Sequence, residues 1–318
     1  MSLTHKEAFS LLQKIDNILV LTHRNPDGDA VGSMFALYHL LKAMGKNVRC
    51  EIDTVTDSLA FAVSEAAFCD FTEDYVISVD LADNKLLTDE QYSLYGDRIF
   101  LAIDHHEKSK PYSRHLLLDF KAAAACEVIY DMISENGISD ISPEIANALY
   151  LGLSTDTGCF RYPNTSAHTF YVASRLVEAG ADSGEINRRV FETKSWNYVR
   201  FETMAMNSMK TYFDGKCAVL VITQDMYKKT GVSEADTHGI AALPRQIEGV
   251  LAGVVVKERT DGTIKISVRS NDPVNASEIC EIFGGGGHRL AAGCDYMGTV
   301  SEAVNAILKV IGDVLEDI

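Results

Sequence analysis

The stretch LTHRNPDGDAVGS, Leu21–Ser33, decides the fold of this chain. It places one imidazole and two carboxylates, those of His23, Asp27 and Asp29, within seven residues and directly after an apolar run. The central NPDG is typical of a turn, and the glycines and alanine that follow are compatible with the start of a helix. A turn alone requires neither His23 nor Asp29, so these two residues need a second explanation.

The first half of the chain alternates between strand-like and helix-like patterns. Short apolar runs typical of buried strands occur at Asn17–Leu21, Val48–Ile52, Tyr75–Val79 and Ile99–Ile103. Helical patterns lie between them, and from Ala123 to about Val190 the pattern is nearly all helical. Alternation of this kind predicts an α/β fold in which a mainly parallel sheet is covered by helices on both faces.

A second α/β pattern follows. Strands are expected within 217–222, 249–258 and 262–270, followed by a helix from Ala276, a glycine run and a last helix over 301–318. A chain of 318 residues is long enough for two hydrophobic cores. We therefore expect a first domain over residues 1–190, a helical connection over 191–214, and a smaller α/β domain over 215–318 that faces the first across a cleft.

The composition excludes several classes of protein. The net charge of −16 disfavours binding to duplex nucleic acid, because the protein and the phosphate backbone repel each other. No basic track that could offset this repulsion is visible in the sequence. The seven cysteines are scattered without a CxxC pair, which argues against a disulfide framework or a zinc knuckle. No apolar stretch approaches the roughly 20 residues of a membrane span, and the N-terminal segment is too polar for a signal peptide. We expect a cytoplasmic protein that does not bind membranes.

Acidic and imidazole side chains recur where the predicted strands and one helix end. These are His23, Asp27 and Asp29 after the first strand, Asp80 after the third, Asp104, His105 and His106 at the fourth, and Asp156 in LSTDTG. Alone, each is explained by a turn, a helix cap or a solvated carboxylate. Together they converge, because ligands bind at the carboxyl ends of parallel strands.

Crowded carboxylates cannot all stay ionised unless cations neutralise them. A mixed set of carboxylate and imidazole ligands suits manganese or a similar divalent ion. The set is larger than one ion needs, so we expect two ions that share a bridging carboxylate. Such a pair, about 3.5–4 Å apart, clamps a phosphoryl group and generates hydroxide at neutral pH.

The second domain offers groups that bind anions. In GTIKISVRS, the side chains of Lys265, Ser267 and Arg269 alternate with apolar ones and face the opposite way. The run FGGGGHRLAAG holds four consecutive glycines followed by His288. Main-chain N–H groups in such a run can approach an anion closely, although a flexible surface loop is the alternative. With Arg269 and His288 nearby, we favour anion binding.

These motifs together resemble those of the DHH-family phosphoesterases. The segments that carry the resemblance are THRNPDGDAVGS, SVDLADNKL, IDHH, STDTGCFRYPNTS, SVRS and GGGGHRLAAG. The last two are similar to motifs of the DHH-associated C-terminal domain, and the resemblance runs over nearly the whole chain. The layout is similar to the two-domain branch of bacterial nano-RNases, which are oligoribonucleases that also dephosphorylate 3′-phosphoadenosine 5′-phosphate. Many chains of this kind are described as exopolyphosphatase-related.

The resemblance implies a role for each motif residue. The metal ligands would be His23 and Asp27 for one manganese ion, Asp29, His105 and Asp156 for the other, and Asp80 as the bridge. Asp104 and His106 would be catalytic, Asp104 by orienting an imidazole and His106 by contacting the scissile phosphate or the leaving oxygen. The substrate-binding residues would be Arg269, Ser270, Gly285, Gly286, Gly287 and His288. Two Mn²⁺ ions are implied, with Mg²⁺ or Co²⁺ as alternatives.

The implied activity is hydrolysis of short oligoribonucleotides to 5′-mononucleotides, and of 3′-phosphoadenosine 5′-phosphate to AMP. The substrates would be short single-stranded RNA or a small phosphorylated nucleotide, and a homodimer is compatible with this reading. Three alternatives remain open at this stage. They are a linear or cyclic dinucleotide phosphodiesterase, an exopolyphosphatase or pyrophosphatase, and an inactive nucleotide-binding regulator.

Overall fold

The computed structural model describes residues 2–316, and the side chains of all of these except residues 235, 236 and 238. The chain divides into two compact units between Thr193 and Lys194, and each unit is described by itself. Within the expected connection over 191–214, α8 (Trp196–Asn207) and β6 (Lys210–Tyr212) both belong to the C-terminal unit. No helix of the described residues is long and apolar enough to cross a membrane.

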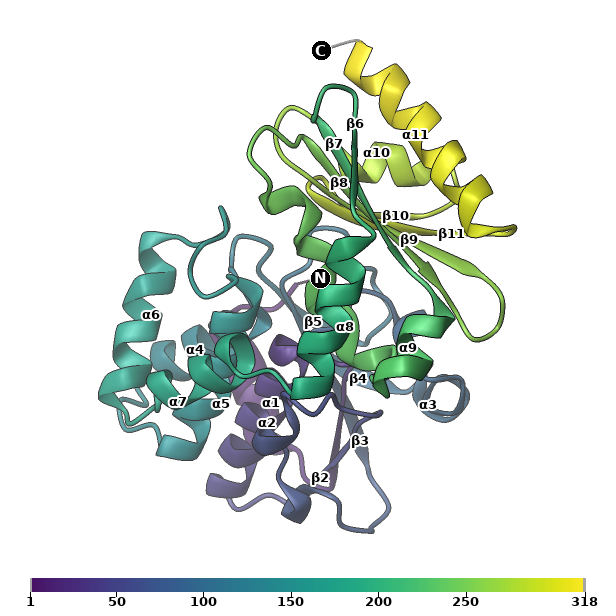
Figure 1. Ribbon diagram of the computed structural model, residues 1–318. Helices are drawn as coiled ribbons and strands as arrows, with labels where there is room; N and C mark the ends of the chain where they lie inside the picture. The colour runs from purple at the N-terminus through teal and green to yellow at the C-terminus, as the bar shows by residue number, and fades with distance from the viewer. Residues whose placement is uncertain (1, 317–318) are drawn as a thin grey trace. The chain divides into compact units, whose positions relative to one another are not determined.

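The N-terminal unit is built on a five-stranded parallel sheet with strand order β2-β1-β3-β4-β5 (Figure 1). The strands are β1 (Ile18–Leu21), β2 (Val48–Glu51), β3 (Tyr75–Val79), β4 (Ile99–Asp104) and β5 (His115–Leu118). The four predicted strands are confirmed to within one residue at each end. Strand β5 was not predicted, because it is a short edge strand in which only Leu117 is buried.

Helices cover both faces of this sheet, as predicted, but unequally. The helices are α1 (His5–Lys14), α2 (Gly28–Ala43), α3 (Asp89–Tyr95), α4 (Ala125–Glu135), α5 (Pro143–Asp156), α6 (Ala167–Glu178) and α7 (Ser183–Asn187). Three short 3₁₀ turns (Ala60–Ala62, Glu65–Ala67, Asn84–Leu86) and a π turn (Arg188–Glu192) complete the unit. Ile18 and Val20 of β1 point into the larger core under α1, α2, α4, α5 and α6, whereas Leu19 and Leu21 point into a smaller core beside α3.

Three glycines let α2 and α5 approach closely. A Cβ atom at Gly32 would lie 2.4 Å from the carbonyl oxygen of Ala148 in α5, and one at Gly28 would lie 2.3 Å from the Thr155 side chain. A Cβ atom at Gly152 would lie 2.5 Å from the Asp29 carboxylate. The contact therefore requires glycine on both helices, and it brings the start of α2 against the end of α5.

The strand order creates a crevice at the carboxyl ends of the strands. From β1 the chain passes to β2 on one side and later to β3 on the other. Where strand connections diverge in this way, the loops after the carboxyl ends of the strands separate and leave room for a ligand. The loops that carry His23 and Asp80 begin at this point, because β1 ends at Leu21 and β3 at Val79.

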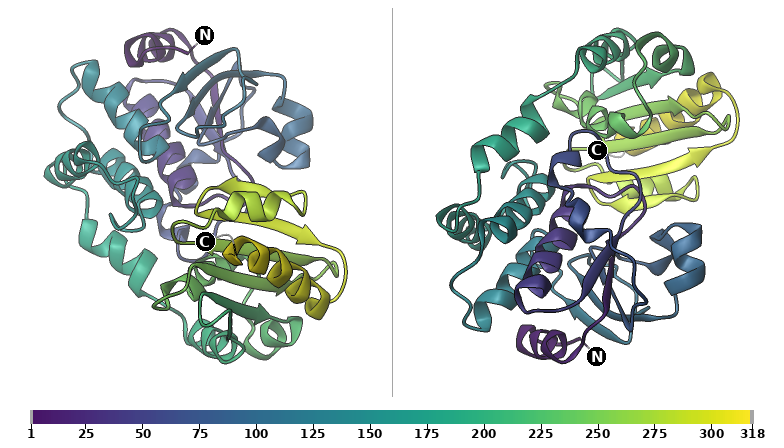
Figure 2. Two further views of the ribbon diagram at one scale, coloured as in Figure 1. Left: turned by 90° about the horizontal axis from the view of Figure 1, so that it is seen from above. Right: turned by 90° about the horizontal axis from the view of Figure 1, so that it is seen from below.

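The C-terminal unit has a six-stranded mixed sheet with strand order β10-β11-β9-β8-β7-β6, in which only β7 and β8 are parallel. Its other strands are β7 (Cys217–Ile222), β8 (Ala252–Glu258), β9 (Ile264–Ser270), β10 (Gly286–His288) and β11 (Ala291–Tyr296). Its other helices are α9 (Gln224–Thr230), α10 (Ala276–Glu281) and α11 (Val300–Glu316), with 3₁₀ turns at Ala235–Ala242 and Pro244–Gln246. Helices α10 and α11 lie on one face of the sheet (Figure 2), and α8 and α9 pack against the other.

The expected alternation in β9 is confirmed. Ile264, Ile266 and Val268 are buried beneath α10 and α11, while Lys265 and Arg269 are half-buried on the opposite face. The glycine run differs from a flexible loop, because its second half forms the edge strand β10, which pairs antiparallel with β11. The two units together confirm the predicted α/β class with a parallel sheet and a second, smaller sheet domain.

Candidate active site

The structure brings the predicted strand-end residues together at the crevice of the N-terminal sheet. His23 and Asp27 lie in the loop after β1, and Asp29 lies in the first turn of α2. Asp80 follows β3, and Asp156 is the last residue of α5. Asp104 ends β4, and His105 and His106 follow it. Segments that are more than 100 residues apart in the sequence thus contribute to one cluster.

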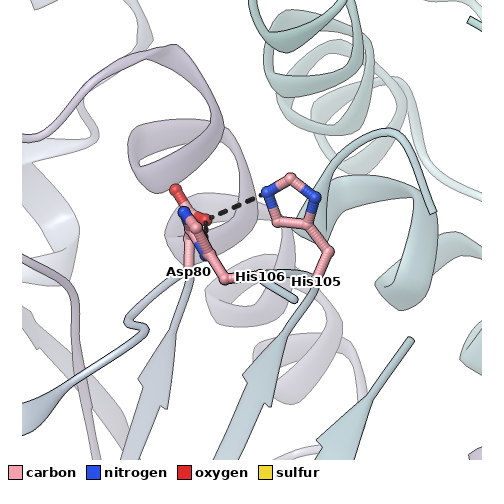
Figure 3. A group of neighbouring side chains, drawn as sticks. All are labelled: Asp80, His105 and His106. Atoms are coloured by element: carbon pink, nitrogen blue, oxygen red, sulfur yellow. Dashed lines mark ion pairs between the residues drawn. The ribbon is translucent and has the colours of Figure 1, made fainter. Parts of the chain in front are cut away.

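Asp80 lies at the centre of the cluster. Its Oδ2 lies 3.8 Å from Nε2 of His23, and its Oδ1 lies 3.6 Å from Nε2 of His105 and 3.6 Å from Nδ1 of His106. Figure 3 shows both of the latter imidazoles turned toward the Asp80 carboxylate. Asp80 is 2% exposed, and its Oδ1 accepts no hydrogen bond from any described residue. A buried carboxylate oxygen without a partner is costly, so this atom is available for a cation.

Three groups of ligand atoms could each hold a metal ion, with all atoms of a group within 4.8 Å of one another. The groups are His23–Asp27–Asp80, Asp29–His105–Asp156 and Asp80–His105–His106. In the second group, His105 Nε2 lies 3.8 Å from Asp29 and 3.3 Å from Asp156. Asp80 and His105 each occur in two groups, so the candidate metal sites lie next to one another and share these two residues.

The imidazoles of His23 and His105 are each oriented by a hydrogen bond to the ring nitrogen that faces away from the carboxylates. Nδ1 of His23 lies 2.9 Å from the Arg24 carbonyl oxygen, and Nδ1 of His105 lies 3.2 Å from that of Ala122. These contacts leave the Nε2 atoms of both rings facing the carboxylates, which is the usual support of a metal-bound histidine. The backbone carbonyls that provide it have no signature in the sequence.

His106 is oriented differently. Its Nδ1 lies 2.7 Å from Oδ1 of Asp104, which is fully buried and also accepts the backbone N–H of His105. Burial favours the neutral imidazole, but the hydrogen bond to Asp104 and the charge of Asp80 outweigh it and raise the pKa of His106. The second oxygen of Asp104, Oδ2, is buried without a partner among the described residues.

Two of the carboxylates also cap helices. Oδ1 of Asp27 accepts the backbone N–H groups of Asp29 and Ala30 and so caps α2. Asp29 accepts the N–H groups of Ala125 at 2.6 Å and Cys126 at 3.0 Å, at the start of α4. The capping role of Asp29 was not predicted from the sequence. The signal was nevertheless present, because AAAAC at residues 122–126, which leads into α4, contains no capping side chain of its own.

The electrostatics of the cluster call for added positive charge. Burial and the charge of Asp80 raise the pKa of Asp29 to about 7. Burial and the charges of Asp29 and Asp27 raise the pKa of Asp156 well above its usual value. Divalent cations would relieve the repulsion that holds these protons. The donor set of carboxylate oxygens and imidazole nitrogens, with no thiolate, fits hard to intermediate divalent ions, so the residues present fit the metal site that the sequence predicts.

The predicted substrate-binding residues lie in the C-terminal unit. Across neighbouring strands, His288 of β10 pairs with Ala291 of β11, which pairs with Arg269 of β9. Residues that pair directly in antiparallel strands share a face, so Arg269 and His288 project from one face with a small alanine between them. Ser270 is fully buried on the opposite face, and its hydroxyl donates to the Arg289 carbonyl oxygen at 3.4 Å. The structure therefore does not bring the Ser270 side chain to the face of Arg269.

The predicted glycines have a packing role that differs from anion binding. A Cβ atom at Gly285 would lie 2.2 Å from the Gly293 carbonyl oxygen, and one at Gly287, whose φ is +148°, would lie 2.6 Å from that of Ala291. For Gly286, nothing lies within 4 Å of an added Cβ. Close approach of β10 to β11 thus explains two of the three glycines.

Comparisons with known proteins identify the family. Residues 17–153 match the N-terminal domain of the DHH family, and residues 214–317 match the DHHA1 domain. The chain is a metal-dependent phosphoesterase that carries an N-terminal domain of the DHH family and a DHHA1 domain. The resemblance stated from the motifs is thereby confirmed.

Several relatives match over nearly their whole length. The bifunctional oligoribonuclease and PAP phosphatase NrnA of Thermus thermophilus is 29% identical over 304 residues, which cover 94% of this chain and 90% of the relative. The protein of the same description from Bacillus subtilis is 29% identical, with 90% and 91% covered. Among solved structures, an exopolyphosphatase-related protein from Bacteroides fragilis superposes with a TM-score of 0.89 at 27% identity, covering 97% of this chain and 96% of the other.

Proposed function

We propose that this protein is a manganese-dependent hydrolase that cleaves short oligoribonucleotides to 5′-mononucleotides and removes the 3′-phosphate of 3′-phosphoadenosine 5′-phosphate. The observation that carries the proposal is the position of Asp80, whose two carboxylate oxygens face different imidazoles of one cluster. The relatives described as bifunctional oligoribonuclease and PAP phosphatase, which match over nearly the full chain, support the choice of substrates.

The proposed ligands are divided between two ions. His23 and Asp27 would hold one ion, Asp29, His105 and Asp156 would hold the other, and Asp80 would contact both. When all are ionised, the four carboxylates of this set would carry four negative charges, which two divalent ions would neutralise. When bound, such a pair of ions activates water at neutral pH and stabilises the negative charge that builds up on a phosphoryl group.

His106 and Asp104 would act on the leaving oxygen. Because the Asp104 carboxylate engages Nδ1 of His106, the ring presents Nε2 as the atom that exchanges a proton with the substrate. The charge of Asp104 also stabilises the imidazolium form. His106 can therefore donate a proton to the departing ribose oxygen, as a general acid.

The C-terminal unit would bind a second part of the substrate. The Arg269 guanidinium lies on the half-buried polar face of β9, where its NH1 donates to the Val268 and Ala292 carbonyl oxygens at 3.1 and 3.4 Å. These bonds fix the direction of the side chain, and the planar fork of a guanidinium suits a phosphate or carboxylate. We therefore assign Arg269 and His288 to a phosphate of the substrate that is not cleaved.

The direct test is a substrate series assayed with and without Mn²⁺. The series contains di- to pentaribonucleotides, 3′-phosphoadenosine 5′-phosphate, cyclic di-AMP and pyrophosphate. We expect Mn²⁺-dependent turnover of the short oligoribonucleotides and of 3′-phosphoadenosine 5′-phosphate, with little turnover of the other two. Turnover of cyclic di-AMP or pyrophosphate alone would replace the proposed substrates, and absence of all turnover would favour a nucleotide-binding regulator.

A matched pair of variants tests the role of the C-terminal unit. Arg269→Ala should raise KM for the oligoribonucleotides and change kcat little, because the residue would bind a phosphate that does not react. Lys309→Ala, on α11, removes a positive charge from the other face of the same sheet and should leave both constants unchanged. An unchanged KM in Arg269→Ala for every substrate would remove Arg269 from the proposal.

A further inference from the structure

A large aromatic side chain is exposed in the turn that follows β5. Phe120 is 59% exposed, and it lies at the tip of the turn that follows β5. Because β5 pairs in parallel with β4, Leu118 lies beside Asp104 at the carboxyl edge of the sheet. Phe120 therefore belongs to the same edge as the cluster.

The turn that carries Phe120 is built into the cluster. The backbone N–H of Asp119 donates to the Asp104 carbonyl oxygen at 3.2 Å, and Asp119 Oδ1 accepts the N–H of Lys121 at 2.9 Å. Two residues after Phe120, the Ala122 carbonyl oxygen lies 3.2 Å from Nδ1 of His105. The exposed ring is thus attached to a segment that orients a proposed metal ligand, rather than to a freely moving loop.

A second segment reaches the same place from the end of α5. Directly after Asp156 the chain makes a turn in which Gly158, Cys159 and Phe160 have φ angles of +56°, +59° and +61°. Residues other than glycine rarely adopt this left-handed conformation, and such strain gathers at ligand sites. Thr157 maintains the turn, because its carbonyl oxygen accepts the N–H of Arg161 at 2.9 Å and its Oγ1 accepts that of Phe160 at 3.0 Å.

The strained turn presents Arg161 to solvent beside the cluster. The Arg161 side chain is exposed and forms no ion pair with any residue that the structure describes, and its Nε donates to the Gly158 carbonyl oxygen at 2.6 Å. The two segments are joined by Asn164, whose Nδ2 donates to the Ala123 carbonyl oxygen at 3.1 Å and to that of Asp156 at 3.2 Å. One side-chain amide therefore links the Phe120 turn, the Arg161 turn and the cluster.

We propose that Phe120 and Arg161 form a nucleobase-binding edge beside the metal cluster. The base of the nucleotide at the cleaved bond stacks on the Phe120 ring, and the planar guanidinium of Arg161 contacts the base. Unstacked bases are recognised in this way by exposed aromatic rings and arginine side chains, with little dependence on base identity. The inference rests on the proposed function and names the part of the substrate that this edge would bind.

The test compares two ligands that differ only in the base. Binding of AMP and of ribose 5-phosphate to the full-length protein is measured by calorimetry in the presence of Mn²⁺. We expect the wild type to bind AMP about 5- to 100-fold more tightly than ribose 5-phosphate, the range of one base stacked on an aromatic ring. Phe120→Ala should reduce this ratio to near one, and it should not change the unfolding temperature, because the side chain is mostly exposed.

Further variants separate stacking from general effects. Phe68→Ala removes a ring that is 47% exposed in the same unit, in the segment before β3 and so away from the carboxyl edge, and it should keep the wild-type ratio. Arg161→Ala should reduce the ratio, and Arg161→Lys should restore it only in part, because the ammonium group is not planar.

The outcomes distinguish this inference from the function on which it rests. If the wild type cleaves short oligoribonucleotides but Phe120→Ala keeps the preference for AMP, the base-binding edge is wrong and the proposed function stands. If the wild type cleaves none of them but its preference for AMP depends on Phe120, the edge stands and the proposed function fails. Equal binding of the two ligands by the wild type overturns the edge directly.

Discussion

Protonation of His23 should make the stability of the metal-free protein depend on pH. Burial by itself would lower the pKa of His23, but the Asp80 carboxylate, 3.8 Å from its Nε2, and the charge of Asp27 outweigh it and raise the pKa to about 9, from 6.5 in the unfolded chain. The folded protein thus binds this proton more tightly than the unfolded chain. The resulting stabilisation is fully present below pH 6.5 and is lost as the pH rises toward 9.

The change in the free energy of unfolding follows from the shift in the pKa of His23. A difference of about 2.5 pKa units corresponds to about 3 kcal/mol, and the imidazole, only 20% exposed, is little screened by solvent. For a unit of the size of residues 1–193, a difference of about 3 kcal/mol in the free energy of unfolding corresponds to a change of roughly 6–12 °C in unfolding temperature. The assay is thermal unfolding of chelator-treated protein between pH 6.5 and 9, for the wild type and His23→Gln.

We expect His23→Gln to be less stable than the wild type at pH 6.5 and to converge with it near pH 9. A matched control is His39→Gln, because burial lowers the pKa of His39 and places its titration outside this window. If the gap in unfolding temperature between the wild type and His23→Gln stays constant with pH, packing alone explains it and the proposed linkage to His23 protonation is refuted. A gap that widens toward pH 9 refutes the linkage as well.

Three further substitutions have defined expectations. Asp80→Asn should lower Mn²⁺-dependent turnover by at least about a thousandfold, the equivalent of several kcal/mol of lost charge stabilisation, whereas Asp74→Asn, just before β3, should retain it. Asp104→Asn should lower kcat by roughly 10- to 100-fold, the usual cost of removing the partner of a site histidine, and wild-type kcat would contradict its role. Gly152→Ala should destabilise the protein by about 1–3 kcal/mol in urea unfolding, because its Cβ would lie 2.5 Å from the Asp29 carboxylate; an unchanged midpoint would show that α2 and α5 separate easily.

The sequence predicted the sheet well where burial dictated composition. The central strands β1, β3 and β4 are apolar runs because both faces of the sheet are covered by helices, and such runs are visible without the structure. Strand β5 has one buried residue, and β11 is built from AAGCDY, in which small residues replace the usual branched ones. Their strand conformation comes from pairing with the neighbouring strands, so the local composition does not reveal it.

The residues of the candidate site could be predicted from the sequence, but the contacts that position them could not. Each motif residue follows a recognisable strand or helix end, and the parallel sheet explains why these ends meet. The capping of α4 by Asp29 and the support of His105 by the Ala122 carbonyl oxygen depend on contacts between distant segments. Ser270 shows the limit of motif matching, because the alternation along β9 already placed its side chain on the face of Ile264 and Val268.

Asp80 is proposed to join two divalent ions in one cluster. Anomalous diffraction at the manganese edge, from crystals of the protein grown with MnCl₂, locates such ions. We expect two peaks about 3.5–4 Å apart, one beside His23 and Asp27 and the other beside Asp29 and Asp156, with the Asp80 carboxylate in contact with both. A single peak, or any pair of peaks that Asp80 does not bridge, would contradict this proposal.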